Sequence, residues 1–125
     1  SSHKNKLAGY VTNNEFNEKL IPIPFQNTIL RNYCKDNNFS YVLPYNETIF
    51  KNSFTQLVTL INKVDNNTAI IACSVFMLPN KIESLNTIVN LLKKNKTYIY
   101  FVYENIFLKN KNDLKKISFE KKFLN

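Results

Sequence analysis

The sequence is poor in the residues on which several common binding sites depend. Its 125 residues include one glycine, two cysteines, one histidine and no tryptophan. With Gly9 as the only glycine, the chain lacks the glycine-rich loop that cradles phosphates in P-loop and dinucleotide-binding proteins. His3, Cys34 and Cys73 do not have the spacing of metal ligands. The sequence therefore predicts neither a nucleotide site of these kinds nor a bound metal or other cofactor.

Long apolar segments are also missing. The longest apolar runs, such as residues 69–75, are far shorter than the roughly 20 residues that span a bilayer. Residues 1–8 lack the apolar stretch of a secretory signal, so we expect a cytoplasmic protein without a membrane span. In that compartment Cys34 and Cys73 are expected to be reduced thiols in the core and not a disulfide.

The length predicts one domain with a single hydrophobic core. The first three residues, Ser-Ser-His, resemble the remnant of an expression tag. We therefore expect residues 1–6 to be an unstructured start and residues 7–125 to form a single α/β domain. A hydrophobic share of 44% with 14% aromatic residues is typical of globular proteins and argues against disorder.

The net charge of +8 comes from lysines, with Arg31 as the only arginine. A basic surface attracts anions in general, but the lysines do not gather in a patch interleaved with aromatic residues. The basic segment 108–122 has Leu114, Ile117 and Phe119 at helical spacing, which favours a helix with a solvated face. Nucleic acid is therefore not the expected partner, and any such binding should be weak and without sequence preference. A homo-oligomer is left open.

Strand and helix patterns alternate along the chain. Period-2 or continuous apolar runs predict strands, and stripes at helical spacing predict helices. The predicted strands are 7–11, 39–44, 68–78 and 97–104, and the predicted helices are 24–36, 54–64, 81–94 and 113–122. Connections of this kind place strands in parallel with right-handed crossovers. We predict an α/β three-layer sandwich of flavodoxin-like type, with a four-stranded parallel sheet in the order 2-1-3-4.

In open parallel sheets, ligands bind beyond the carboxyl ends of the strands. Two carboxylates follow predicted strands there, and Glu47 and Glu104 are the candidate acid/base pair. The candidate ligand-binding residues lie at the same strand ends or on the first helix; they are Tyr10, Thr12, Gln26, Asn27, Arg31, Asn46, Ser74 and Asn105. No histidine or lysine is adjacent to Ser74 in the sequence to activate it as a nucleophile.

The first helix raises the sharpest question. The expected inward stripe is Phe25, Ile29, Leu30 and Tyr33, which places Gln26 at about 100° from Phe25 and within the stripe. We hypothesise that Gln26 meets a ligand at the helix start, where free N–H groups add to the site. Arg31, one turn deeper, would hold Glu104 or Glu47 from below.

Simpler interpretations stay open for each of these residues. Gln26 can satisfy the backbone of a loop, and Arg31 can pair with Asp36 or Glu47 on the surface. Carboxylates at strand ends are commonly loop caps, which is the alternative for both Glu47 and Glu104.

Several segments resemble the sporadic carbohydrate cluster family of bacterial surface-polysaccharide gene clusters. The resemblance rests on "GYV", "PIPFQNTILRNYC", "SVFMLP" and "YENIFL", and it covers about residues 8–110. The matching positions are Gln26, Asn27, Arg31, Tyr33 and Cys34 in the helix, then Ser74, Phe76, Leu78, Pro79 and Glu104. It implies a role in lipopolysaccharide, capsule or flagellar glycan biosynthesis. Together with the polar groups expected at the carboxyl edge of the sheet, it leads us to expect that the protein binds or modifies an anionic, sugar-derived ligand there, a sugar nucleotide or sugar phosphate. It implies no reaction, so whether the protein is an enzyme stays open.

A second resemblance is to the catalytic domain of serine recombinases, or resolvases. That family opens with G-Y-x-R-x-S, and here "GYVTNN" places Thr12 at the arginine position and Asn14 at the serine position. "LPNK" stands where a basic cluster is expected. The resemblance therefore implies the fold without the chemistry. The alternative function is a catalytically inactive resolvase-like module that binds nucleic acid or protein.

Overall fold

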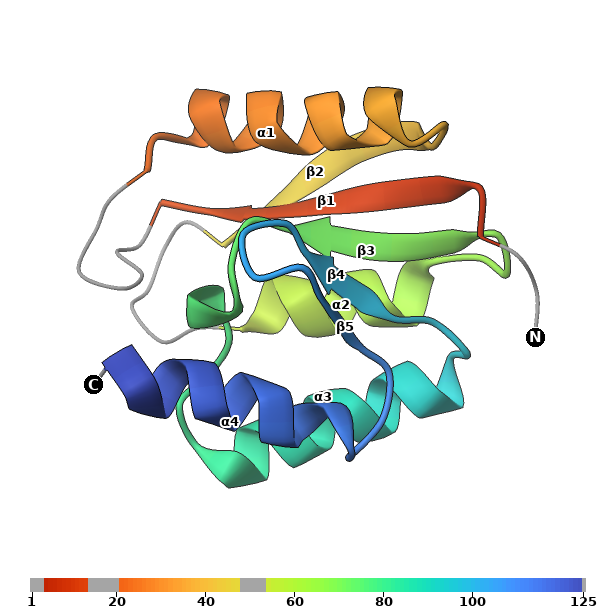
Figure 1. Ribbon diagram of the computed structural model, residues 1–125. Coiled ribbons are helices and arrows are strands. Elements are labelled where there is room, and N and C mark those ends of the chain that lie inside the picture. Colours follow the sequence, from red (N-terminus) through yellow and green to blue (C-terminus); the bar gives the residue numbers. More distant parts are fainter. Residues whose placement is uncertain (1–3, 14–20, 48–53, 125) are drawn as a thin grey trace.

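The computed structural model describes residues 4–13, 21–47 and 54–124 (Figure 1). The strands are β1 (Lys6–Thr12), β2 (Ser40–Glu47), β3 (Thr68–Ala72), β4 (Ile99–Phe101) and β5 (Ile106–Leu108). The helices are α1 (Ile23–Asp36), α2 (Thr55–Lys63), α3 (Ile82–Lys94) and α4 (Asp113–Leu124), with a short 3-10 helix η1 (Val75–Met77). The predicted alternation of strands and helices is confirmed.

The five strands form one sheet in the order β2-β1-β3-β4-β5. The first four are parallel and have the predicted order, whereas β5 pairs antiparallel with β4. The four predicted parallel strands are therefore present in the predicted order, and the structure adds a fifth, antiparallel strand at one edge. The reversal occurs at Asn105, whose φ of 56° is in the left-handed region that asparagine tolerates better than most residues. The predicted strand 97–104 consequently ends at Phe101.

Helices cover the two faces of the sheet unequally. Figure 1 shows α1 on one face, beside β1 and β2, and α2, α3 and α4 on the other. Right-handed crossovers explain the places of α1, α2 and α3, because the chain moves from β1 to β2 in one direction and from β2 to β3 and β4 in the opposite one. The face that carries α1 therefore has no second helix in the described part of the chain.

The central strand β3 is buried at every position, as expected for an inner strand covered on both faces. It is shorter than the predicted strand 68–78, because the chain turns into η1 at Val75. Ser74 caps this turn by accepting a hydrogen bond at Oγ from the N–H of Phe76, 3.2 Å away. The second half of the predicted strand 68–78 is therefore a capped 3-10 turn and not a strand.

The inward face of α1 differs from the predicted stripe. Gln26, Leu30 and Cys34 are buried, while Phe25 is 64% exposed. Cys34 behaves as a small apolar residue, and its burial rotates the packed face away from Phe25. Cys34 and Cys73 are both buried and unbonded, which confirms the prediction for the thiols.

The start of the chain is more ordered than expected. The ammonium of Lys4 donates to the carbonyl oxygen of Asn66 at 2.8 Å, and the N–H of Asn5 donates to the carbonyl of Asn67 at 3.0 Å. The expectation of an unstructured start is therefore wrong for residues 4–6. No helix within the described ranges is long and apolar enough to cross a membrane.

Candidate functional site

The Gln26 side chain closes the loop between β1 and α1. Its Nε2 donates to the carbonyl oxygens of Thr12 at 2.6 Å and Ile21 at 2.7 Å, and its Oε1 accepts from the N–H of Thr12 at 3.2 Å. The side chain is completely buried. A buried amide needs partners, and here the backbone supplies them from both ends of one loop. These contacts match the simpler interpretation, in which Gln26 satisfies the backbone of a loop. The amide is not free to bind a ligand.

The start of α1 is also less open than expected. Pro22 and Pro24 have no N–H, and the N–H groups of Phe25 and Gln26 both donate to the carbonyl of Pro22, at 3.0 and 3.1 Å. The helix therefore presents few free donors to an anion, although it begins near the carboxyl end of β1.

Tyr41 organises the flank of α1. Its ring lies over Gly9 of the neighbouring strand, where an added Cβ would be 2.9 Å from Tyr41 Cζ. Its hydroxyl donates to Oδ1 of Asn27 at 3.0 Å, and the Arg31 guanidinium lies 5.2 Å from the ring centroid. Burial raises the pKa of Tyr41 to about 12, so the phenol keeps its proton and remains a donor. We name these three residues, Asn27 and Arg31 of α1 and Tyr41 of β2, the Tyr41 cluster.

The bulge beside Gly9 allows this arrangement. The register of β1 with β2 shifts between Ala8, which pairs with Val42, and Tyr10, which pairs with Tyr45. Pro44 falls in the shifted segment, where the regular hydrogen-bond pattern between the strands is already interrupted and the missing N–H of proline is tolerated. The only glycine of the chain therefore stands where a neighbouring ring crosses the strand.

Glu104 is held at the ends of β3 and β4. Its Oε2 accepts from the Ser74 hydroxyl at 2.7 Å, and its Oε1 accepts from the N–H of Val75 at 2.9 Å. Together with the bond from Phe76 N–H to Ser74 Oγ, this network caps η1 and ties the β4–β5 turn to the end of β3. Ser74 and Glu104 were both predicted to lie at this edge of the sheet, and they are in direct contact.

The prediction that Arg31 holds Glu104 or Glu47 is wrong for Glu104, and for Glu47 it stays a prediction because that side chain lies outside the described residues. Arg31 lies over Tyr41 of β2, whereas Glu104 follows β4. The strand order separates β2 from β4 by three spacings of about 4.8 Å each. No carboxylate, including that of Asp36, forms an ion pair with Arg31 in the parts of the chain described. The surface ion pair with Asp36, the simpler alternative, is therefore absent as well.

The remaining candidates separate into core and loop positions. Tyr10 and Thr12 are 2% and 5% exposed, so their side chains are part of the interior. Asn46 and Glu47 pair through the backbone with Val11 and Thr12, but their side chains, like Asn14, lie outside the described residues. Asn105 accepts a hydrogen bond from the Tyr100 hydroxyl at 2.6 Å and stabilises its own turn. No group of three potential metal ligands occurs among the described residues.

Two features were missed at the level of sequence. Tyr41 gave no signal on its own, although a lone glycine in a strand is a sign of close approach by another group. Lys121 is 7% exposed, and its ammonium donates to the carbonyls of Leu78 at 2.7 Å and Pro79 at 3.0 Å and to Oδ1 of Asn80 at 3.0 Å. Burial lowers the pKa of Lys121 to about 8. This lysine fastens α4 to the segment between η1 and α3.

No family model matches this sequence, and no curated protein sequence matches it significantly. The fold is similar to that of solved recombinase domains. The N-terminal catalytic domain of TP901-1 integrase is 16% identical, with a TM-score of 0.59 over 93% of this chain and 95% of that one. A resolvase family site-specific recombinase from Streptococcus pneumoniae is 10% identical, with a TM-score of 0.63 over 94% of this chain and 87% of that one. The chain therefore has a resolvase-like α/β fold, as the second sequence resemblance implied.

Proposed function

We propose that the protein binds a small anionic, hydroxyl-bearing molecule of the sugar phosphate or sugar nucleotide class, at the Tyr41 cluster. The observation that carries this proposal is Arg31. Arg31 is the only arginine of a chain with 16 lysines, and its side chain is exposed. Its guanidinium lies over the Tyr41 ring and forms no ion pair with an acidic residue among the residues described. A guanidinium held on an aromatic face keeps its fork of donors available for a phosphate or carboxylate.

Asn27 supplies the complementary group. It lies one helical turn from Arg31, so the two side chains share one flank of α1. The Tyr41 hydroxyl occupies its Oδ1, which fixes the amide, while its Nδ2 donates to no group in the described part of the chain. An amide N–H next to a guanidinium suits a ligand in which hydroxyl oxygens stand beside a phosphate.

The biological role in this proposal is bacterial surface carbohydrate biosynthesis. Its support is the resemblance of the first helix to the carbohydrate cluster motif, in which Asn27 and Arg31 are matching positions. We assign binding and no reaction, because Glu104 and Ser74 use their polar atoms on one another and on the backbone of η1. A carboxylate bonded in this way caps a turn, which is the simpler alternative given above for Glu104.

A thermal-shift series tests the proposal. Glucose 1-phosphate and UDP-glucose are compared with glucose and with inorganic phosphate. A ligand at ten times its dissociation constant should stabilise the chain by about 1.4 kcal/mol, which raises the melting temperature by roughly 5 °C. Arg31→Lys should remove most of this shift because it keeps the charge and loses the fork.

Lys35→Ala is the matched control, since it removes an exposed charge from the same helix. Asn27→Ala should weaken the sugar derivatives more than inorganic phosphate. Equal shifts for the parent chain, Arg31→Lys and Lys35→Ala would refute the Tyr41 cluster as the binding site.

The fold favours a second candidate, an inactive recombinase-like module that binds nucleic acid. Its support is the similarity to recombinase domains combined with Thr12 at the arginine position of their opening motif. Binding of duplex DNA below micromolar concentration at physiological salt, with a preference between sequences, would favour this candidate. Weak binding that vanishes as salt rises is expected from the +8 charge alone.

A further inference from the structure

Exposed aromatic side chains gather near the end of the chain. Among the residues whose burial the structure describes, six large hydrophobic ones are exposed, and three of them lie within residues 103–119: Tyr103 at 52%, Phe107 at 41% and Phe119 at 64%. They belong to the β4–β5 turn, to β5 and to α4. Single exposed apolar residues need no explanation, so what surrounds these rings decides whether they belong to a binding surface.

The edge itself is open. β5 is the last strand in the order, so in the described part of the chain one of its sides has no neighbouring strand. Between Ile106 and α4 lies an open hollow of about 490 Å³, lined by Ile106, Lys115, Lys116, Phe119 and Glu120. Lys115 and Phe119 are four residues apart, as are Lys116 and Glu120, so these side chains share one face of α4.

The other face of β5 has a similar character. The Phe107 ring contacts Tyr98 and Tyr100, with centroids 5.3 and 4.7 Å apart. Tyr33 of α1 contacts Tyr100, with centroids 4.7 Å apart. The ammonium of Lys109 lies 5.3 Å from the Tyr98 centroid and 5.4 Å from that of Phe107. Aromatic rings and lysines thus flank the edge strand on both sides.

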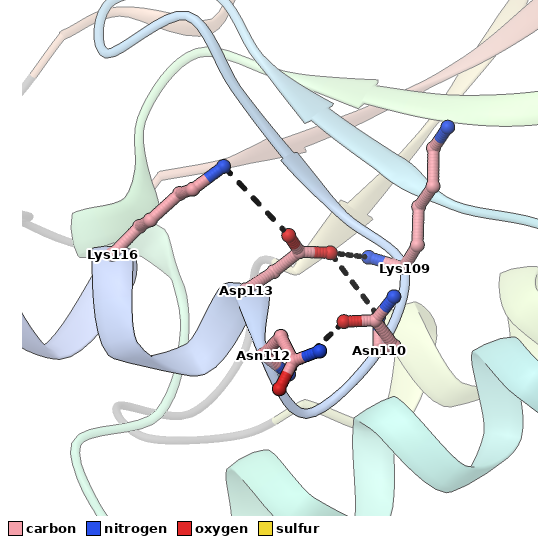
Figure 2. Close-up of polar contacts among 5 residues, drawn as sticks. All are labelled: Lys109, Asn110, Asn112, Asp113 and Lys116. Carbon is pink, nitrogen blue, oxygen red and sulfur yellow. Dashed lines mark hydrogen bonds and ion pairs between the residues drawn. The ribbon is translucent and has the colours of Figure 1, made fainter.

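Figure 2 shows the polar contacts in the turn between β5 and α4. Asp113 directs its carboxylate to the backbone, where Oδ2 accepts from the N–H groups of Lys109 at 2.8 Å and Asn110 at 3.2 Å. Its Oδ1 is 4.0 Å from the Lys116 ammonium, a weak contact for a side chain that is 68% exposed. The Lys109 ammonium points away from this carboxylate. Lys109, Lys115 and Lys116 therefore outnumber the acids beside them, Asp113 and Glu120.

We propose that β5 and the adjoining face of α4 form a docking surface for an extended, acidic polypeptide segment. An edge strand binds such a segment by backbone hydrogen bonds, and alternate side chains then reach the two sides of the strand. Aliphatic side chains of the segment meet Phe107 on one side and the hollow beside Phe119 on the other. Its carboxylates meet Lys109, Lys115 and Lys116.

The charge and the strand edge select this partner over the alternatives. Another copy of the chain carries the same +8 charge and the same lysines, so edge-to-edge pairing with it is disfavoured. A nucleic acid has no peptide backbone that could pair with the open edge of β5. In addition, the Lys109 ammonium already lies over two of the rings that bases would stack on.

A displayed library of random eight-residue peptides, selected on the immobilised 125-residue chain, tests the proposal. We expect enrichment of peptides in which aspartate or glutamate alternates with aliphatic residues. A synthetic copy of an enriched peptide should bind about tenfold more weakly to Lys115→Glu/Lys116→Glu and to Phe107→Ser. Lys93→Glu/Lys94→Glu changes the net charge equally on exposed positions of α3 and should bind like the parent chain.

Methylation of alternate backbone nitrogens in the peptide should abolish binding, because it blocks strand pairing. The proposal fails if no acidic peptide is enriched, or if both double variants weaken binding equally. It also fails if a labelled oligo-deoxythymidine binds the same edge and displaces the peptide.

Discussion

The ring of Tyr41 lies across the backbone of Gly9 on the neighbouring strand. This contact explains the position of the only glycine of the chain, because any Cβ at that point would meet the ring and the hydroxyl. It also places the Tyr41 hydroxyl on Asn27 and the ring under Arg31, so the packing of a strand determines the geometry of the proposed binding site.

Gly9→Ala should lower the free energy of unfolding by about 1–3 kcal/mol, because the half-buried ring must move out of place. In a Tyr41→Ala background the same substitution should be neutral or slightly stabilising, since alanine restricts the unfolded chain more than glycine does. Urea unfolding of the four chains gives the coupling energy. A coupling near zero would show that the ring can move aside without cost.

Gln26→Leu should be strongly destabilising. The substitution leaves the N–H and carbonyl of Thr12 and the carbonyl of Ile21 without their partner, and each buried, unsatisfied group costs about 1–3 kcal/mol. Asn32→Leu, at an exposed position of the same helix, is the control and should change stability little. Unchanged or higher stability of Gln26→Leu would instead favour a ligand-binding role for this amide.

Glu104 should act as a cap that does not depend on its charge. Glu104→Gln keeps an acceptor for the Val75 N–H and an amide that can donate to Ser74 Oγ, so we expect a loss of stability below about 1 kcal/mol. Glu104→Leu should cost about 1–3 kcal/mol, because it leaves the N–H of Val75 without an acceptor. Equal losses in the two variants, measured by urea unfolding, would mean that the carboxylate charge itself is needed.

Lys121 should make stability depend on alkaline pH. Burial lowers its pKa from 10.5 to about 8, so the folded chain releases this proton at lower pH than the unfolded chain does. The cost of burying the charge is fully present below pH 8 and disappears as the pH rises toward 10.5. The free energy of unfolding of the parent chain should therefore rise between pH 8 and pH 10 relative to that of Lys121→Met.

The exposed Lys115→Met is the control for this measurement and should run parallel to the parent chain. Tyrosines with raised pKa values titrate above this window and are common to all three chains. A constant difference between the parent chain and Lys121→Met from pH 7 to pH 10 would contradict a lowered pKa for Lys121.

Both thiols should be unreactive in the native protein. Burial raises the pKa of Cys34 to about 11 and that of Cys73 to about 12, so neither forms a thiolate at pH 8. Thiol titration without reductant should therefore find two free groups after denaturation and almost none before it. Rapid labelling of one thiol in the native chain would reveal local opening around α1 or β3.

Much of the fold could be predicted because it depends on local patterns. The continuous apolar run of β3 is typical of a buried strand. The apolar stripes of α2 and α3 repeat with the period of a helix. Connections between parallel strands are right-handed, so this alternation also limited the order of the first four strands to a few possibilities, among them the observed one. The antiparallel β5 was not predicted because it has only three residues. The turn before it also falls partly within the apolar run 97–104, which was interpreted as one strand.

The partners of the polar residues could not be predicted in the same way. Helical periodicity indicated that Gln26 faces inward, and Ser74 and Glu104 were expected at one edge. Which atoms they meet depends on strand register and on small rotations of helices. A shift in the packed face of α1 buried Cys34 and exposed Phe25. Arg31 lies over Tyr41 of β2, and the two strands between β2 and β4 keep it away from Glu104.

By itself, the sequence determined the class of fold, the reduced core thiols and the absence of glycine-rich phosphate loops, because composition and short-range periodicity carry that information. Only the tertiary structure decided that Tyr41 crosses Gly9, that Gln26 closes its own loop and that Lys121 is held by neutral oxygens. Each of these contacts joins residues whose approach depends on the packing of several elements at once. No local pattern encodes such an approach, since it depends on how close-packed side chains share the space between the sheet and its helices.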